Sequence, residues 1–145
     1  MKQGLLANEV RAWLLRPTVV HRLPGRLRLR VPALTRLDDG QRICASFWRD
    51  LLAAPAEIEA VEVNLRTGSV LIRYRTAVLG EYELLAFIRS VNRLVLRHWD
   101  RLAAVRPDAL PEVLERLLEV VRGAVRHRLV LDERIEVPQD VWPEA

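Results

Sequence analysis

A short stretch of strict alternation constrains this chain more than any other feature of its sequence. From position 26 onward the residues are, in order, Arg26, Leu27, Arg28, Leu29, Arg30 and Val31. This period of two predicts a β-strand with one buried and one exposed face. The three guanidinium groups then leave the strand in the same direction. Like charges on one face repel each other, so this face is costly unless water, carboxylates or an anionic partner lies against it.

Length and composition fit one ordinary domain, or a small core domain with a helical appendage. The chain has 145 residues, of which 50% are hydrophobic and 29% charged, enough for a core without disulfides. A single cysteine leaves no partner for an intrachain disulfide and no CxxC pair, so we expect a reducing, cytoplasmic setting. Glu9 and Arg11 interrupt the apolar N-terminal stretch, and no uncharged run reaches spanning length. We expect a protein that is soluble, or at most peripheral to a membrane.

The net charge of +4 is unevenly placed. Residues 1–50 contain 10 basic and 4 acidic residues, whereas residues 51–145 contain 13 and 15. Lys2 is the only lysine, and the planar fork of arginine suits bidentate contacts with phosphate or carboxylate. A GC-rich genome would raise the number of arginines for reasons unrelated to function, but it would not produce their alternation along one strand.

The periodicity along the chain predicts an α+β protein. Strands are expected at 26–33, 60–65 and 69–75, and helices at 3–15, from an acidic cap at Asp38 to Pro55, at 80–107 and at 108–127. The last two helices, joined by a short turn, would form a helical hairpin. A further strand within 129–137 is left open. The predicted units are an N-terminal amphipathic helix (1–17), a core domain (18–91), a helical hairpin extension (92–128) and a C-terminal strand or tail (129–145).

The predicted order of elements is strand, helix, strand, strand and helix. This order is most of a ferredoxin-like βαββα(β) unit with an antiparallel sheet. Residues 58–76 resemble the second and third strands of the heavy-metal-associated (HMA-like) domain of copper chaperones and heavy-metal P-type ATPases. Residues 21–32 resemble a divergent bacterial branch with an arginine-rich first strand. Similar domains occur beside metal-transporting ATPases and among small proteins of iron-storing compartments. The resemblance covers roughly residues 20–90, and it implies this fold and a role in metal homeostasis.

The chain departs from the family where copper chaperones bind metal. Their paired cysteines lie between the first strand and the first helix, because thiolates suit a soft monovalent ion. The corresponding residues 34–40 contain no cysteine. Cys44 lies a turn into the following helix, and one sulfur cannot make a two-coordinate site. The resemblance therefore implies the fold but not thiolate binding of copper.

The arginines of the first and third predicted strands are the candidate binding residues, because these strands are neighbours in the fold that the resemblance implies: Arg26, Arg28, Arg30, Arg73 and Arg75. One reading is a solvated face that Glu62 partly neutralises. The other is a platform for a phosphate-bearing ligand, an acidic protein tail or a membrane surface. Nucleic acid is not an expected partner, because base-stacking sheets carry exposed aromatics and Tyr74 is assigned to the inner face.

The sequence gives little support for metal ligands or catalytic groups. His21, Asp39 and Cys44 are the weak metal candidates, although Asp38 and Asp39 suit a helix cap and Cys44 suits a small core residue. There is no phosphate-cradling glycine loop, nucleophile elbow or cysteine pair. We therefore expect a protein that is not an enzyme and carries no cofactor.

The leading hypothesis is an accessory module of bacterial metal homeostasis, with iron or another transition metal as the metal concerned. It would dock an anionic protein partner, such as a metal-transporting P-type ATPase or a component of a metal-storage compartment, and a homo-oligomer is compatible with it. The alternative is a peripheral membrane or polyanion-binding protein that uses the same basic face and the N-terminal amphipathic helix. A third hypothesis is a metal carrier that uses His21, Cys44 and Asp39.

Overall fold

The computed structural model describes residues 18–125, 131–132 and 134–143. The helix expected over residues 3–15, and the unit 1–17 built on it, lie outside the described residues. The strands are β1 (Thr18–Leu23), β2 (Arg26–Arg30), β3 (Ile58–Asn64) and β4 (Ser69–Tyr74). The helices are α2 (Arg42–Leu52), α3 (Glu81–Arg97), α4 (Trp99–Ala103) and α5 (Leu110–Ala124), with 3₁₀ turns η1 (Pro32–Arg36) and η2 (Gln139–Val141).

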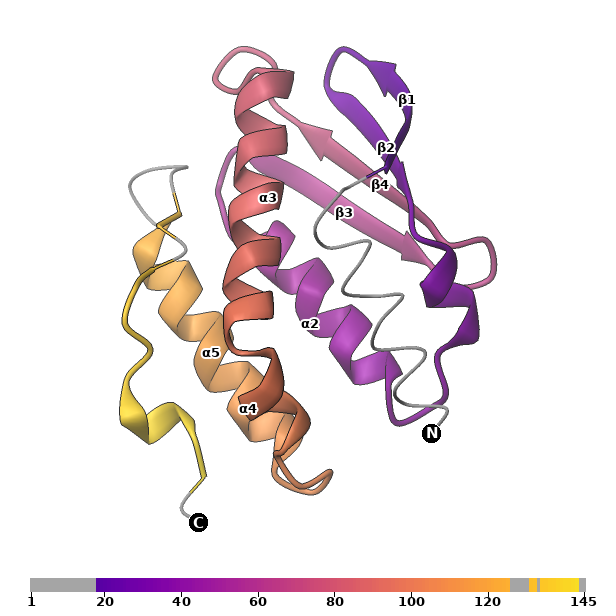
Figure 1. Ribbon diagram of the computed structural model, residues 1–145. Coiled ribbons are helices and arrows are strands. Elements are labelled where there is room, and N and C mark those ends of the chain that lie inside the picture. Colours follow the sequence, from indigo (N-terminus) through magenta and orange to yellow (C-terminus); the bar gives the residue numbers. More distant parts are fainter. Residues whose placement is uncertain (1–17, 126–130, 133, 144–145) are drawn as a thin grey trace.

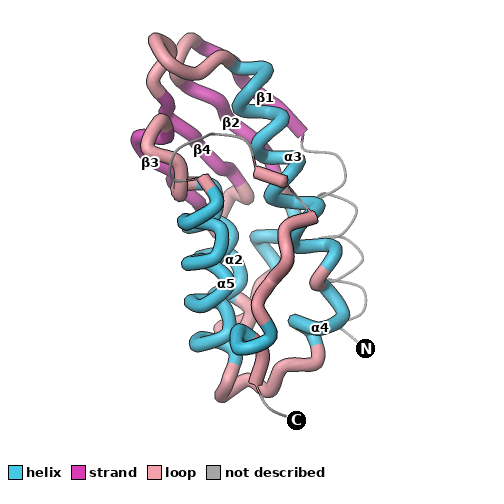
Figure 2. The backbone as a smooth tube through the Cα atoms, turned by 90° about the vertical axis from the view of Figure 1, so that its left-hand side faces the viewer, coloured by secondary structure: helices cyan, strands magenta, loops and turns pink. Residues whose placement is uncertain are grey.

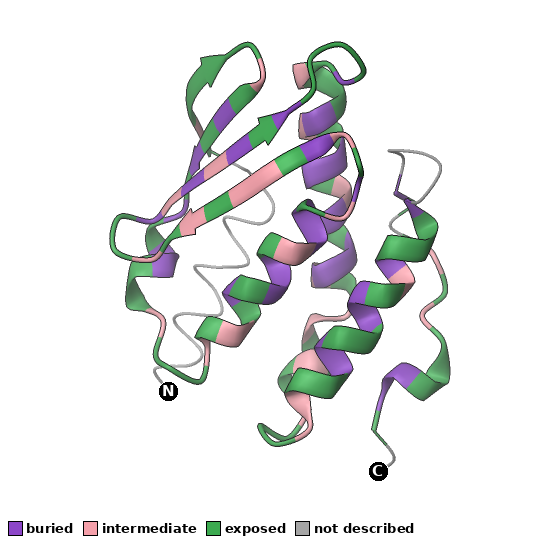
Figure 3. Ribbon diagram, turned by 180° about the vertical axis from the view of Figure 1, so that it is seen from behind, coloured by how far each residue is buried: buried purple, intermediate pink, exposed green. Residues whose placement is uncertain are grey.

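The four strands form one antiparallel sheet in the order β1-β2-β4-β3. Helices α2 and α3 lie on one side of it, and α5 lies beside α2 on the far side from the strands (Figures 1 and 2). This arrangement confirms the predicted α+β class with a ferredoxin-like sheet. Seen from behind, the other face of the sheet has no described helix over it (Figure 3).

Strand β1 is an element that sequence reasoning missed. Thr18, Val19 and Val20 are β-branched, a composition that favours strands, and the turn at Pro24-Gly25 joins them to β2 as a hairpin. Through this hairpin β1 occupies the sheet edge beside β2. A strand from the C-terminal tail would have needed that edge, and the described part of the tail, 131–132 and 134–143, contains no strand.

The single helix predicted over 80–107 is two helices. The backbone N–H of His98 donates to the carbonyl of Val95, three residues back, which tightens the last turn and ends α3. Helix α4 then starts at Trp99. The boundary expected between residues 91 and 92 falls inside α3, so no break in the chain separates the sheet domain from the helices that follow. Strand β2 ends at Arg30, earlier than expected, because Pro32 begins η1.

The core follows the alternation of the strands. Leu27 and Leu29 of β2 and Val70 and Ile72 of β4 are fully buried, while the arginines between them are exposed. One buried side-chain hydrogen bond links the two helices that cover the sheet. Trp48 Nε1 of α2 donates to Asn92 Oδ1 of α3 at 2.9 Å. Apolar residues of α5 and of the C-terminal segment belong to the same core cluster as the strands. The described parts of the chain are therefore one packed unit.

Candidate anion-docking face

The exposed side of the sheet carries the arginines that the sequence singled out. In register, Arg26 lies opposite Arg73, Arg28 opposite Leu71, and Arg30 opposite Ser69. Arg75 follows one residue after the end of β4 and is exposed as well. We call these five residues the arginine face: Arg26, Arg28, Arg30, Arg73 and Arg75. The structure places the predicted set on one side of the sheet, and the inner side of the same strands fixes this orientation by burying leucine, valine and isoleucine.

No cation of the arginine face has an ion pair within the described part of the chain. Glu62 is exposed on β3, but Leu71 of β4 is its neighbour across the strands, and Leu71 separates it from Arg28. Arg26 and Arg73 are direct cross-strand neighbours, and like charges in such pairs destabilise a sheet. An anion that bound between them would relieve this repulsion.

The arginine face is hollowed at one end of the sheet. A shallow hollow of about 510 Å³ lies where the β1–β2 turn meets the end of β4. Arg26, Arg73 and Arg75 line it together with Glu59 and Thr76, so cations outnumber carboxylates three to one in its wall. We call it the tip pocket. Its donors are guanidinium groups and a hydroxyl, which are the groups that hold phosphate and carboxylate oxygens.

Gly25 shapes the tip pocket. Its φ of +76° lies in the left-handed region that glycine adopts at no steric cost. A Cβ at this position would lie 3.1 Å from the carbonyl oxygen of Tyr74. The Gly25 carbonyl in turn accepts a hydrogen bond from the Tyr74 N–H at 3.0 Å. Glycine therefore lets the turn approach β4 closely enough to hold Arg26 beside Arg73.

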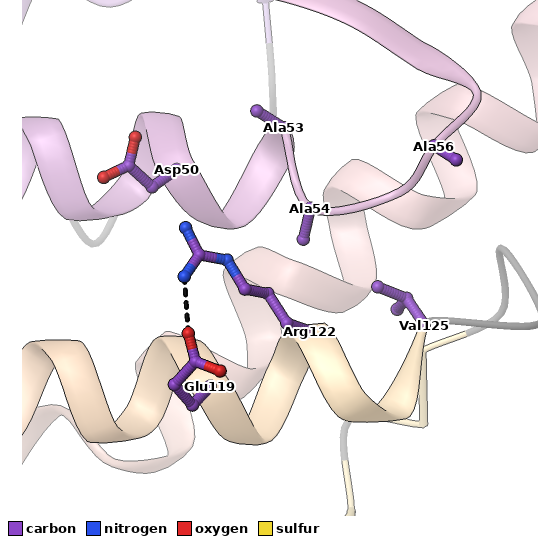
Figure 4. Close-up of a pocket in the computed structure, with 7 residues that line it drawn as sticks. All are labelled: Asp50, Ala53, Ala54, Ala56, Glu119, Arg122 and Val125. Atoms are coloured by element: carbon purple, nitrogen blue, oxygen red, sulfur yellow. Dashed lines mark hydrogen bonds and ion pairs between the residues drawn. The ribbon is translucent and has the colours of Figure 1, made fainter.

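A second hollow, between α2 and α5, has a different electrostatic character. Arg122 of α5 projects there between Glu119 and Asp50 (Figure 4). It pairs with Glu119, and a further contact of 3.8 Å links it to Glu115. Asp50 also pairs with Arg49 at 3.2 Å. The charges in this hollow are matched within the molecule, in contrast to the arginine face.

The loop between η1 and α2, where the resemblance to copper chaperones would place a metal site, has the wrong chemistry for a soft ion. Asp38 Oδ1 accepts a hydrogen bond from the Gln41 N–H at 2.8 Å, and Gln41 Oε1 accepts one from the Asp38 N–H at 3.1 Å. This reciprocal pair has the pattern of a capping box, but it lies in the turn before α2, whose N-cap residue is Gln41 and not the predicted Asp38. Asp39 forms an ion pair with Arg42 at 3.4 Å. The loop therefore serves to start α2.

The three weak metal candidates are not brought together. His21 lies in β1 opposite Arg28, whereas Asp39 precedes α2 and Cys44 lies in its first turn. Cys44 is exposed rather than part of the core, yet surrounding protein atoms raise the pKa of its thiol by desolvation. That shift disfavours the thiolate, the form that binds metal. No group of three or more potential ligands gathers anywhere in the described ranges. These residues do not fit a resident metal ion.

Sequence reasoning missed the other residues of the tip pocket. Gly25 was assigned only to a turn, and Glu59 and Thr76 were not singled out. The positive φ of Gly25 was signalled by the Pro24-Gly25 pair, which is typical of tight turns. The approach of that turn to Thr76 depends on the pairing of β2 with β4, and no local pattern encodes it.

None of the helices in the described residues is long and apolar enough to cross a membrane.

Comparison with curated proteins gives no match, and comparison with solved structures gives none either. The profile of the family described as heavy metal associated domain 2 matches residues 17–98. This span runs from the residue before β1 to the end of α3, so it includes the whole sheet, the arginine face and the tip pocket. Such domains generally act as metal-associated binding or adaptor modules and commonly contact other proteins. The match covers more than half of the chain, which therefore belongs to the heavy metal associated domain 2 family.

Proposed function

We propose that this protein is a non-catalytic adaptor of bacterial metal homeostasis that docks an acidic protein segment on its arginine face. Iron or another transition metal is the metal concerned, and the partner is a metal-transporting P-type ATPase or a component of a metal-storage compartment. The adaptor works in the cytoplasm. Family membership supports the metal-associated role, and the donor chemistry of residues 31–41 argues for docking rather than for carrying a metal.

One observation carries this proposal: exposed arginines stand side by side on neighbouring strands with no internal carboxylate paired to them. Elsewhere on the molecule, arginines such as Arg42, Arg116 and Arg122 pair with nearby acidic residues. The sheet holds the backbone of these arginines in place, and the planar fork of each guanidinium loses less side-chain entropy per hydrogen bond to a carboxylate than a lysine would. Their summed field also accelerates the approach of an acidic partner.

A fluorescent peptide of ten glutamates tests the proposal as a probe for an acidic protein segment. The triple variant Arg26→Gln, Arg28→Gln and Arg30→Gln should fold normally, because all three side chains are exposed. It should bind the probe roughly 10- to 100-fold more weakly, since three exposed ion pairs are lost. Fluorescence anisotropy at constant salt measures the change, and the affinity of the wild-type protein should fall as salt is added.

A matched control removes the same net charge from the helical side of the molecule. Arg89, Arg106 and Arg134 are exposed and lie outside the sheet, so their replacement by glutamine should leave the affinity for the probe close to the wild-type value. Equal weakening by both triple variants would show that net charge alone attracts the probe. That outcome, or unchanged binding by the sheet variant, would contradict docking on the arginine face.

A further inference from the structure

The tip pocket lies at the same end of the molecule as several exposed apolar side chains. The large hydrophobic residues that are exposed in the described parts of the chain are Val20 (48%), Leu23 (47%), Val78 (60%) and Tyr82 (81%). Leu23 directly precedes Pro24 of the pocket wall, and Val78 directly follows Ala77 of the same wall. Leu23 and Val78 therefore flank the cationic hollow, whereas Val20 lies further down β1, next to the residue that pairs with Leu29.

An ion pair holds these segments together. Arg22 of β1 contacts Glu81 in the first turn of α3 at 3.5 Å. Leu23 and Tyr82 are the next residues along their segments, so the pair keeps the two apolar side chains at one end of the fold. In Figure 1 the β1–β2 turn and the loop between β4 and α3 both lie at the top of the molecule. We call Leu23, Val78 and Tyr82 together with the tip pocket the tip.

The composition of the tip matches a membrane surface better than an acidic peptide. Tyrosine and aliphatic side chains favour the boundary between lipid headgroups and acyl chains. Arginines beside them can reach lipid phosphates, which are anionic and suited to guanidinium forks. An acidic peptide would satisfy the cations but would leave exposed apolar side chains on both flanks in water. A lipid surface satisfies both kinds of group at once.

We propose that the tip docks on membranes that contain anionic lipid, with a lipid phosphate in the tip pocket and with Leu23, Val78 and Tyr82 in the interfacial layer. This contact is distinct from the N-terminal amphipathic helix expected from the sequence, and it does not depend on the proposed protein partner. Arg28 and Arg30 lie further along β2, away from the turn, so they stay available to an acidic protein while the tip contacts lipid.

Vesicle flotation with the full-length protein tests the proposal. Wild-type protein should float with vesicles of phosphatidylcholine that contain phosphatidic acid, and should remain in the lower fraction with phosphatidylcholine alone. Arg73→Gln with Arg75→Gln should weaken partitioning about thirtyfold, because each arginine near an anionic surface contributes a factor of about five. Leu23→Ser with Val78→Ser should weaken it about tenfold through lost apolar insertion.

The apolar double variant is the decisive measurement, because it keeps every cation. Flotation equal to that of the wild type would overturn the proposal, since charge or another part of the chain would then account for binding. Absence of wild-type flotation would overturn it as well. Arg89→Gln with Arg106→Gln removes the same charge away from the tip, so a loss in this control equal to the loss in the arginine variant would also overturn it.

The test is separate from that of the adaptor function. Leu23→Ser with Val78→Ser should bind the ten-glutamate peptide as the wild type does, because the arginine face is unchanged. Loss of vesicle binding with intact peptide binding supports the tip alone. Loss of both would contradict the assignment of separate contacts, provided that circular dichroism shows the folded state.

Discussion

At the scale of single residues, His98 is a titratable group whose surroundings disfavour its charged form. Its Nε2 is buried and has no hydrogen-bond partner among the residues that the structure describes, and its ring lies 5.7 Å from that of Trp142. Arg101 lies over the same tryptophan ring, with its guanidinium carbon 4.5 Å from the ring centroid. Burial lowers the pKa of His98, and the positive charges of Arg97 and Arg101 lower it further.

This shift makes stability depend on pH. Because the pKa of His98 is lower in the folded than in the unfolded protein, the unfolded protein binds more protons as pH falls. The stabilisation should be complete above the unfolded pKa of about 6.5 and should be lost progressively below it. His98→Phe keeps an aromatic ring but cannot titrate. Urea unfolding at pH 7.5 and 5.5 should show a larger drop for the wild type than for the variant; equal drops would contradict this reading.

At the scale of elements, the turn between β3 and β4 depends on one glycine. Gly68 has a φ of +75°, and a Cβ there would lie 2.6 Å from the carbonyl oxygen of Val31. The Val31 N–H donates to the Gly68 carbonyl at 2.7 Å, so this contact anchors the segment that leaves β2. Gly68→Ala should lower the free energy of unfolding by about 1–3 kcal/mol through backbone strain and displacement of Val31.

Gly123 supplies the opposite case within the same chain. It lies in α5, and no atom of the described ranges would come within 4 Å of an added Cβ. Gly123→Ala should raise the free energy of unfolding by about 0.5–1 kcal/mol, because alanine favours helix. Thermal unfolding of both variants measures the contrast. A rise in stability for both variants would show that the close approach to Val31 does not limit position 68.

The elements that could be predicted from the sequence are those with a strong local period. Alternation fixed the inner and outer sides of β2 and β4, and therefore the exposure of Arg26, Arg28 and Arg73. Strand β1 could not be predicted because apolar and polar residues do not alternate along it. The structure shows the corresponding irregularity as a register shift between Val19 and His21. The break at His98 was missed because apolar residues continue at helical spacing on both sides of it. The tip depends on contacts between distant segments, which no local pattern reports.

At the scale of the whole molecule, the C-terminal segment completes the core of the sheet domain. Val141 and Trp142 are buried, with exposed fractions of 3% and 6%, and they join one cluster with Leu27 and Ile72 of the sheet. Arg116 of α5 donates to the carbonyl of Asp140 at 3.0 Å, which fixes the segment against the helix. Residues beyond the family match at 98 are therefore packed into the same core, and we expect them to unfold with it.

Trp142→Ala should lower the free energy of unfolding by about 3–5 kcal/mol, because removing a buried indole leaves a cavity that the packed helices cannot fill. Tyr82→Ala, at a position 81% exposed, should stay within about 0.5 kcal/mol of the wild type. Urea unfolding followed by far-ultraviolet circular dichroism and by tryptophan fluorescence should give one coincident transition for the wild type.

If the tail were an independent appendage, Trp142→Ala would leave the circular dichroism transition unchanged. The sheet and helices α2, α3 and α5 would then unfold at the same urea concentration whether or not the tail is packed. A shared core instead requires that loss of this one side chain lower the midpoint seen by both probes.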